Sequence, residues 1–150
     1  MRVFTGADEL RAAAGEQLGT SDWMTIEQQR VNAFADATED HQWIHIDPQR
    51  AAAGPFGATI AHGFLTLSLL PHLIDQTYRV EGSTMVVNYG LNKVRFPAPV
   101  PVGSAVRAEV ALVEATEVSG GLQLVLRATL QIEDSAKPGC VAYWVTRVYF

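Results

Sequence analysis

The chain has 150 residues, of which 48% are hydrophobic and 18% are charged. This composition is typical of a packed globular protein and excludes an intrinsically disordered one. The formal net charge is −5, and the 11 Lys and Arg residues are scattered singly, which argues against a protein that binds nucleic acid. Because the length is that of one folding unit, we expect a single domain over residues 1–150.

Cys140 is the only cysteine in the chain. One cysteine cannot form an intramolecular disulfide, which fits a reducing compartment, and we expect this residue to be a small buried hydrophobe. The first residues show no apolar core followed by a cleavage site, and no run of about 18 apolar residues occurs. These observations predict a cytoplasmic protein without a membrane partner.

Residues 25–38 are predicted to form the first helix. Thr25 and Gln28 have the spacing of a capping box, in which the Thr hydroxyl accepts from first-turn N–H groups and the Gln side chain reaches back. The residues that recur at helical spacing, and are therefore expected to face a core, are Ile26, Arg30, Phe34 and Ala37. This helix leads directly to Glu39 and Asp40.

Residues 47–74 are predicted to form a broken connector and then a buried helix. Proline and glycine placement between Asp47 and Gly57 predicts a loop or short broken helices, because a residue before proline avoids helical angles. Residues 62–74 carry apolar side chains on nearly every side, which predicts a helix that is buried all round. Pro71 removes one intrahelical hydrogen bond and predicts a kink or an early end.

The second half of the chain is predicted to form a sheet. Alternation and composition predict strands over residues 85–89, 93–96, 104–115, 122–133 and 140–150. Gly120-Gly121 and residues 137–139 stand where hairpin turns are needed, so the later strands are expected to be antiparallel neighbours. A curved antiparallel sheet wrapped around a central buried helix, the α+β arrangement called the hot dog fold, satisfies both patterns.

Four titratable residues, Asp40, His41, His45 and Asp47, lie just past the first predicted helix. Asp40 and His45 would point about 140° apart on a continuous helix, so they can meet only if the helix ends between them. A carboxylate and an imidazole that meet can hold one water, and hydration of a polarised double bond needs such a pair. The alternative is that Asp40 caps or solvates the helix end and that His45 fills a core position.

Gly63 opens the second predicted helix. Free N–H groups in the first turn can stabilise an enolate oxygen derived from a thioester carbonyl, and glycine leaves room for that approach. The alternative is a tight junction between loop and helix, where glycine is needed for packing alone. The combination of this glycine with Asp40 and His45 favours the chemical interpretation.

Two motifs, ADATEDHQWIHIDPQRA at residues 35–51 and IAHGFL at residues 60–65, resemble those of the MaoC-like dehydratases and (R)-specific enoyl-CoA hydratases. The family signature reads approximately Gly-Asp-x-Asn-Pro-aliphatic-His, followed by five residues and a small one. The positions kept in this chain are Asp40, Ile44, His45 and Ala51. The chain departs from the signature at Glu39 for Gly, Gln42 for Asn and Trp43 for Pro. Residues 88–104 also look like the strand-turn-strand region of the family.

The resemblance implies a hot dog fold, usually in a homodimer whose sheets join, and an acyl-CoA or acyl-carrier-protein thioester as substrate. It implies reversible (R)-specific hydration of trans-2-enoyl-CoA to (R)-3-hydroxyacyl-CoA, with no metal and no other cofactor. Carried over by position, Asp40 is the general base, His45 positions the water and exchanges its proton, and the Gly63 N–H is the oxyanion donor. Gln42, through an amide offered to the carboxylate, and His62 are weaker substrate-binding candidates.

Three other interpretations stay open. A metal site made from Asp40, His41, His45 and His62 is conceivable, although no HxH or HExxH spacing supports it. A thioesterase of the same fold would direct water at the thioester carbonyl. A non-catalytic acyl-binding or partner subunit would fit the departures from the signature. The sequence leaves the acyl-chain length, the carrier and the pathway undetermined.

Overall fold

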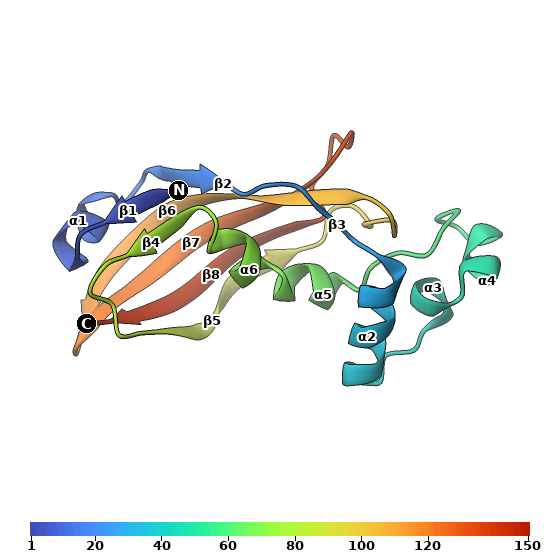
Figure 1. Cartoon of the computed structure of the whole chain (residues 1–150), viewed down its shortest axis with the longest axis horizontal. Helices are drawn as coiled ribbons and strands as arrows, with labels where there is room; N and C mark the ends of the chain where they lie inside the picture. The colour runs from blue at the N-terminus through green and yellow to red at the C-terminus, as the bar shows by residue number, and fades with distance from the viewer.

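A curved sheet of six strands forms the main body of the computed structural model, which describes all 150 residues (Figure 1). The strand order is β2 (Gln17–Thr20), β6 (Ala105–Val118), β7 (Gly121–Ile132), β8 (Cys140–Tyr149) and β5 (Met85–Arg95), with β3 (Met24–Thr25) also pairing with β6. All of these pairs are antiparallel. A small parallel pair of β1 (Arg2–Phe4) and β4 (Tyr78–Val80) lies near α1 (Ala7–Ala12) at one end.

The predicted antiparallel neighbours are confirmed. β6 and β7 pair around the turn at Gly120, whose positive φ of 77° suits a glycine, and β7 pairs in turn with β8. The prediction of separate strands over residues 85–89 and 93–96 is wrong, because the single strand β5 runs through both. Its register with β8 shifts after Asn88 and again after Leu91, and such irregularities interrupt the alternation that a sequence pattern relies on.

The helix predicted over residues 62–74 consists of α5 (Gly63–Ser68) and α6 (Leu70–Ile74), which lie against the concave face of the sheet (Figure 1). The predicted break is confirmed, with Pro71 in the first turn of α6. Inward side chains of helices and strands share one core, which includes Leu65, Leu70, Leu73, Leu112, Leu124, Leu126 and Leu130. The prediction of a helix buried all round is wrong on one side. Phe64 is 69% exposed, because the sheet covers only the side of α5 that is turned toward the sheet.

Residues 28–62, which we call the overhang, extend beyond one end of the sheet (Figure 1). The overhang contains α2 (Gln28–Thr38), α3 (Trp43–Ile46) and α4 (Pro48–Ala52). The short broken helices predicted after Asp47 are confirmed. The Asp47 carboxylate accepts a hydrogen bond of 3.0 Å from the backbone N–H of Arg50, and Pro48 stands in the first turn of α4, where it removes no needed donor.

Two expectations about α2 are wrong. The helix begins at Gln28 without a side-chain cap, and Thr25 belongs to β3, so no capping box forms. The side chains that α2 buries are Val31 and Ala35. Arg30 and Ala37, two members of the predicted inward stripe, are exposed. The helix begins two residues after Ile26 and lies beyond the sheet. It therefore buries a different and narrower stripe of side chains.

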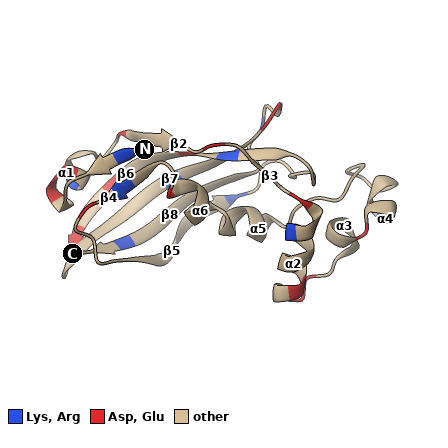
Figure 2. Cartoon of the chain, viewed as in Figure 1, with Lys and Arg blue, Asp and Glu red and all other residues tan.

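The single cysteine and the charged residues agree with the analysis of the sequence. Cys140 is buried in the core, and burial raises the pKa of its thiol to about 11, so it behaves as a small hydrophobe. Lys and Arg are dispersed over separate elements and do not gather into a stripe (Figure 2). None of the helices has the length and apolar character needed to cross a membrane.

Candidate active site

Asp40 and His45 are brought together by a sharp change of chain direction after α2. The helix ends at Thr38, before Asp40, and Glu39 adopts a left-handed conformation with φ 61° and ψ 18°. His45 lies within the short helix α3. The predicted end of the helix, at residue 38 and before Asp40, is therefore confirmed, and both side chains point to one place.

The two groups lie close enough for one water molecule to bridge them. One carboxylate oxygen of Asp40, one ring nitrogen of His45 and one of His62 all lie within 4.8 Å of one another. Two hydrogen bonds of about 2.8 Å that meet at a tetrahedral water span roughly 4.6 Å. Asp40 is exposed and His45 is only 6% exposed, so the pair lies at the boundary between the surface and the protein interior.

The hydrogen bond of His45 fixes the tautomer of its ring. Nδ1 lies 2.7 Å from the backbone carbonyl oxygen of Ile60, which can only accept, so Nδ1 carries the hydrogen and Nε2 keeps a free lone pair. Burial lowers the pKa of His45 more than its hydrogen bond to Ile60 raises it, and the neighbouring His62 lowers the pKa further. The ring is therefore neutral at neutral pH and can accept a hydrogen bond through Nε2.

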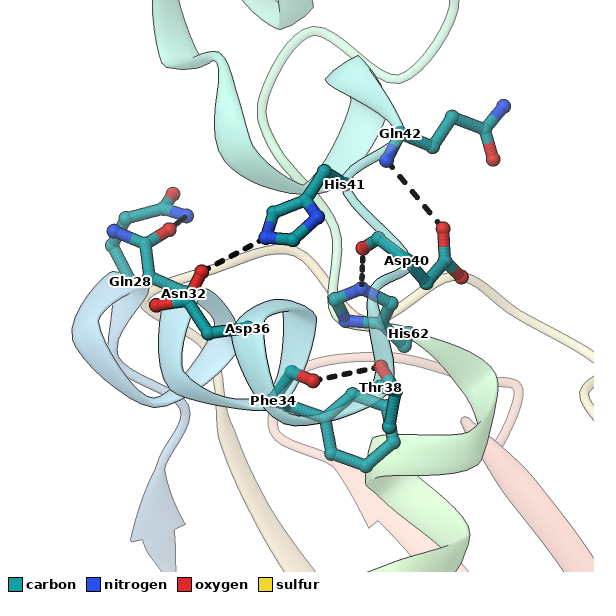
Figure 3. Close-up of polar contacts among 9 residues, drawn as sticks. All are labelled: Gln28, Asn32, Phe34, Asp36, Thr38, Asp40, His41, Gln42 and His62. Atoms are coloured by element: carbon teal, nitrogen blue, oxygen red, sulfur yellow. Dashed lines mark hydrogen bonds and ion pairs between the residues drawn. The ribbon is translucent and has the colours of Figure 1, made fainter.

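The residues around Asp40 leave its carboxylate free to react. The backbone N–H of Gln42 makes a long hydrogen bond of 3.4 Å to Oδ1, while the Gln42 side chain extends away from the carboxylate (Figure 3). His41 instead contacts Asp36, at 2.8 Å on the exposed surface, and Asp47 caps α4. Of the four titratable residues in this segment, the structure brings only Asp40 and His45 together.

Gly63 lies at the start of α5 with an N–H that donates to no other group of the chain. A Cβ atom at this position would lie 3.2 Å from three atoms of the Phe96 ring, so a larger residue would displace that ring. Glycine is thus needed here for packing. The free N–H agrees equally with the oxyanion role, so both interpretations of this glycine are compatible with the structure.

Gln28 contacts the candidate site, although its spacing from Thr25 predicted a role in a capping box. Its side-chain NH₂ donates to the backbone carbonyl of His45 at 2.7 Å, and its amide oxygen accepts from the Thr59 hydroxyl at 2.6 Å. One amide therefore links α2, α3 and the segment before Gly63. Nothing in the local sequence signals this role, because the two partners lie 17 and 31 residues away.

The departures from the family signature have structural counterparts. Glu39 occupies a left-handed conformation that glycine adopts at no steric cost, which explains why a glycine is usual there. Trp43 is the first residue of α3, a position that favours proline. Its ring lies under the Arg50 guanidinium at 4.4 Å and against Gly54, where an added Cβ would be 3.0 Å away.

The ring geometry does not favour a shared metal ion. The His45 and His62 rings are stacked, with centroids 3.8 Å apart and planes inclined by 24°. Lone pairs in planes that are so nearly parallel do not converge within a metal–nitrogen bond of about 2.1 Å. Each ring also has one nitrogen engaged with a backbone carbonyl.

Comparisons with known proteins place the fold and the family. A family model described as MaoC like domain matches residues 9–133. A Mycobacterium tuberculosis protein named 3-hydroxyacyl-thioester dehydratase Z is 60% identical over 148 residues, which cover 98% of each chain.

Solved structures agree with this family. A monoamine oxidase regulatory protein from Archaeoglobus fulgidus, 22% identical, superposes with a TM-score of 0.81 over 99% of this chain and 96% of that one, which shows the fold. An (R)-hydratase from A. caviae, 28% identical, superposes with a TM-score of 0.67 over 88% of this chain and 96% of that one.

The predicted hot dog fold is thereby confirmed, and the protein is an enzyme of the hydro-lyase class, which adds or removes water. The chain belongs to the MaoC-like dehydratase family.

Proposed function

We propose that the protein catalyses the reversible addition of water to trans-2-enoyl-CoA, giving (R)-3-hydroxyacyl-CoA. The observation that carries this proposal is that an Asp40 carboxylate oxygen and a His45 ring nitrogen lie within 4.8 Å of each other, close enough for one water to bridge. The names of the two relatives add support, since one is a 3-hydroxyacyl-thioester dehydratase and the other an (R)-hydratase. The first supplies the thioester class and the second the stereochemistry.

In the hydration direction, the Asp40 carboxylate takes one proton from water while His45 Nε2 holds the other hydrogen. The water oxygen bonds to C3, the C2–C3 double bond becomes single, and the electron pair moves to the thioester oxygen as an enolate. The Gly63 N–H donates to that oxygen. The proton then passes to C2, so one water is consumed and both side chains return to their starting states.

Acid–base catalysis and the oxyanion donor each have a typical effect on the rate. General acid–base help is worth about 10²–10⁴ in rate, and it depends on a neutral His45 and an ionised Asp40. One oxyanion donor is worth about 10²–10³. Asp40→Asn keeps the shape of the side chain and its contact with the Gln42 N–H but loses the base, so its effect on folding is small.

A homodimer formed through β5 is part of the same proposal. β5 is the end strand of the six-stranded sheet, and its apolar side chains are exposed: Met85, Val86, Val87, Tyr89 and Leu91. An unpaired, apolar edge strand is a template for pairing with another chain. A second copy paired along β5 would continue the sheet and cover this edge. Sedimentation is expected to give twice the chain mass of 16.3 kDa, and a monomer at micromolar concentration would contradict the dimer.

The reaction is tested by following the loss of enoyl-thioester absorbance with crotonyl-CoA and longer trans-2-enoyl-CoAs. Wild type is expected to turn over, and Asp40→Asn and His45→Gln are each expected to lose about 10²–10⁴ in kcat while staying folded. Asp36→Asn, which changes an exposed carboxylate outside the site, is the matched control and should retain full activity.

Three outcomes would overturn the assignment. Retained activity in Asp40→Asn would remove Asp40 from the mechanism. Release of free thiol without a hydrated product would identify a thioesterase, and binding without turnover would identify a non-catalytic acyl-binding subunit. Chiral analysis of the 3-hydroxyacyl product tests the (R) configuration separately.

A further inference from the structure

His62 is a buried polar residue with a contact to the main chain of Asp40. It lies immediately before α5 and is only 3% exposed. Its Nε2 lies 2.9 Å from the backbone carbonyl oxygen of Asp40, 22 residues earlier in the chain (Figure 3). Because a carbonyl can only accept, Nε2 carries the hydrogen and donates it.

The ring of His62 also supports the ring of His45. The two imidazoles stack with centroids 3.8 Å apart, and the Phe34 ring of α2 lies 4.9 Å from His62. His62 thus contacts both residues of the proposed water-handling pair, one through its main chain and the other through its ring. It joins them to the start of the helix that carries Gly63.

One nitrogen of His62 has no partner. With the hydrogen on Nε2, the buried Nδ1 is a lone pair, and no group in the chain donates to it. A buried polar atom without a partner costs about 1–3 kcal/mol, whereas an apolar side chain of similar size would fill the space without that cost. The hydrogen bond to Asp40 is the one that the ring makes, and it explains why a histidine stands at this position despite the cost.

We propose that His62 is a positioning residue for the hydration reaction, which holds the Asp40 main chain and the His45 ring at the separation that one water spans. This inference rests on the proposed function. In this role His62 acts through its neighbours, by placing the Asp40 main chain and the His45 ring. Loss of its hydrogen bond frees the segment between α2 and α3, so the carboxylate drifts from the water while the substrate site remains.

Three substitutions separate the hydrogen bond from the ring packing. His62→Gln places an amide N–H close to the position of Nε2 and keeps the bond to Asp40. His62→Asn reaches only to the position of Nδ1 and loses that bond. His62→Phe keeps a ring against His45 and Phe34 but has no donor, and it serves as the second variant without the bond if His62→Asn fails to fold.

The expected result is a loss in kcat without a loss in KM. His62→Asn and His62→Phe should lose about 10- to 100-fold in kcat on crotonyl-CoA, with KM within about threefold of wild type, because misplacement of reacting groups by about 1 Å has an effect of this size. His62→Gln should stay within about fivefold of wild type. Equal kcat in all variants, or a loss confined to KM, would overturn the positioning role.

A measurement without substrate tests the same geometry. Nitrogen-15 NMR of histidine-labelled protein near neutral pH should show a hydrogen on Nε2 of His62, and should show His45 as the neutral Nδ1–H tautomer. A His62 ring without a hydrogen on Nε2 would contradict the bond to Asp40. Lack of wild-type turnover would defeat the proposed function, whereas an active wild type with an equally active His62→Asn would defeat the role of His62 alone.

Discussion

Different kinds of interaction stabilise the sheet and fix the side chains of the overhang. In the sheet, β6, β7 and β8 pair over their whole lengths, and the inner face buries side chains such as Leu112, Leu124 and Leu126 completely. The overhang projects beyond this sheet, and four single hydrogen bonds connect the segments around Asp40 and His45. They are the amide of Gln28 to His45, the hydroxyl of Thr59 to Gln28, the ring of His45 to Ile60 and the ring of His62 to Asp40.

Stability and the proposed chemistry therefore depend on different interactions. Apolar burial is non-directional and tolerates small shifts, so it stabilises the sheet without fixing any reacting group to a fraction of an ångström. Hydrogen bonds are directional, and a few of them can fix Asp40 and His45 while adding little net stability. Substitutions in the two regions should therefore move different measurements.

The largest effect on stability is expected in the sheet. Leu126→Ala leaves a cavity at a position that is fully buried, and it should lower the free energy of unfolding by about 2–5 kcal/mol. Urea unfolding measures this loss. The kcat of the molecules that remain folded should equal that of wild type. A fall in kcat comparable to that of Asp40→Asn would contradict the separation of the two regions.

A smaller effect is expected at Gln28, where stability and chemistry meet. Gln28→Ala removes the partner of the His45 carbonyl and of the Thr59 hydroxyl, which costs about 1–3 kcal/mol of local stability. Because α3 is then less firmly held, kcat should fall roughly tenfold. Gln29→Ala is the matched control, since the neighbouring Gln29 is exposed on the same helix. Hydrogen exchange should speed up in α3 and not in β7; equal behaviour of the two variants would remove Gln28 from the site.

The pH dependence tests the environment of His45. Because burial lowers the pKa of His45, the acid limb of the kcat/KM profile, which reports the free enzyme, should lie below the ordinary value of about 6.5. The unfolded chain binds this proton at higher pH than the folded protein does. The contribution to stability is therefore fully present above about pH 6.5 and decreases as the pH falls below it. Urea unfolding at several pH values should show this slope in wild type and a weaker one in His45→Gln; an acid limb above 6.5 would contradict the burial effect.

The smallest effect is expected at Glu39, the left-handed residue between α2 and Asp40. A non-glycine residue in this conformation costs about 1 kcal/mol, so Glu39→Gly should stabilise the protein by roughly 0.5–1 kcal/mol. Asp134, with φ 59° in the connection between β7 and β8, is the corresponding position on the sheet side. Asp134→Gly should give a similar gain, measured as a rise in the melting temperature. Destabilisation by both variants would show that their side chains contribute more than the backbone strain costs.

The sequence by itself determined the architecture and the family. Alternation along β7 and β8 and the glycines at the β6–β7 turn predict an antiparallel sheet, because the period of a strand and the needs of a turn are local properties. The spacing of Asp40 and His45, together with Gly63, pointed to the hydratase family, which the comparisons bear out. The roles of these three residues remain predictions.

The tertiary structure decided the residues that hold the site. The sequence predicted a capping role for Gln28 and predicted neither its contact with His45 nor the contact of His62 with Asp40, because a local pattern says nothing of partners that lie 17 and 22 residues away. The same reason applies to the buried side of α2 and to the exposure of Phe64, which depend on where the sheet ends. Hydrogen-bond partners and burial depend on which residues from distant parts of the chain pack together. Strand alternation and turn residues depend only on neighbours in the sequence.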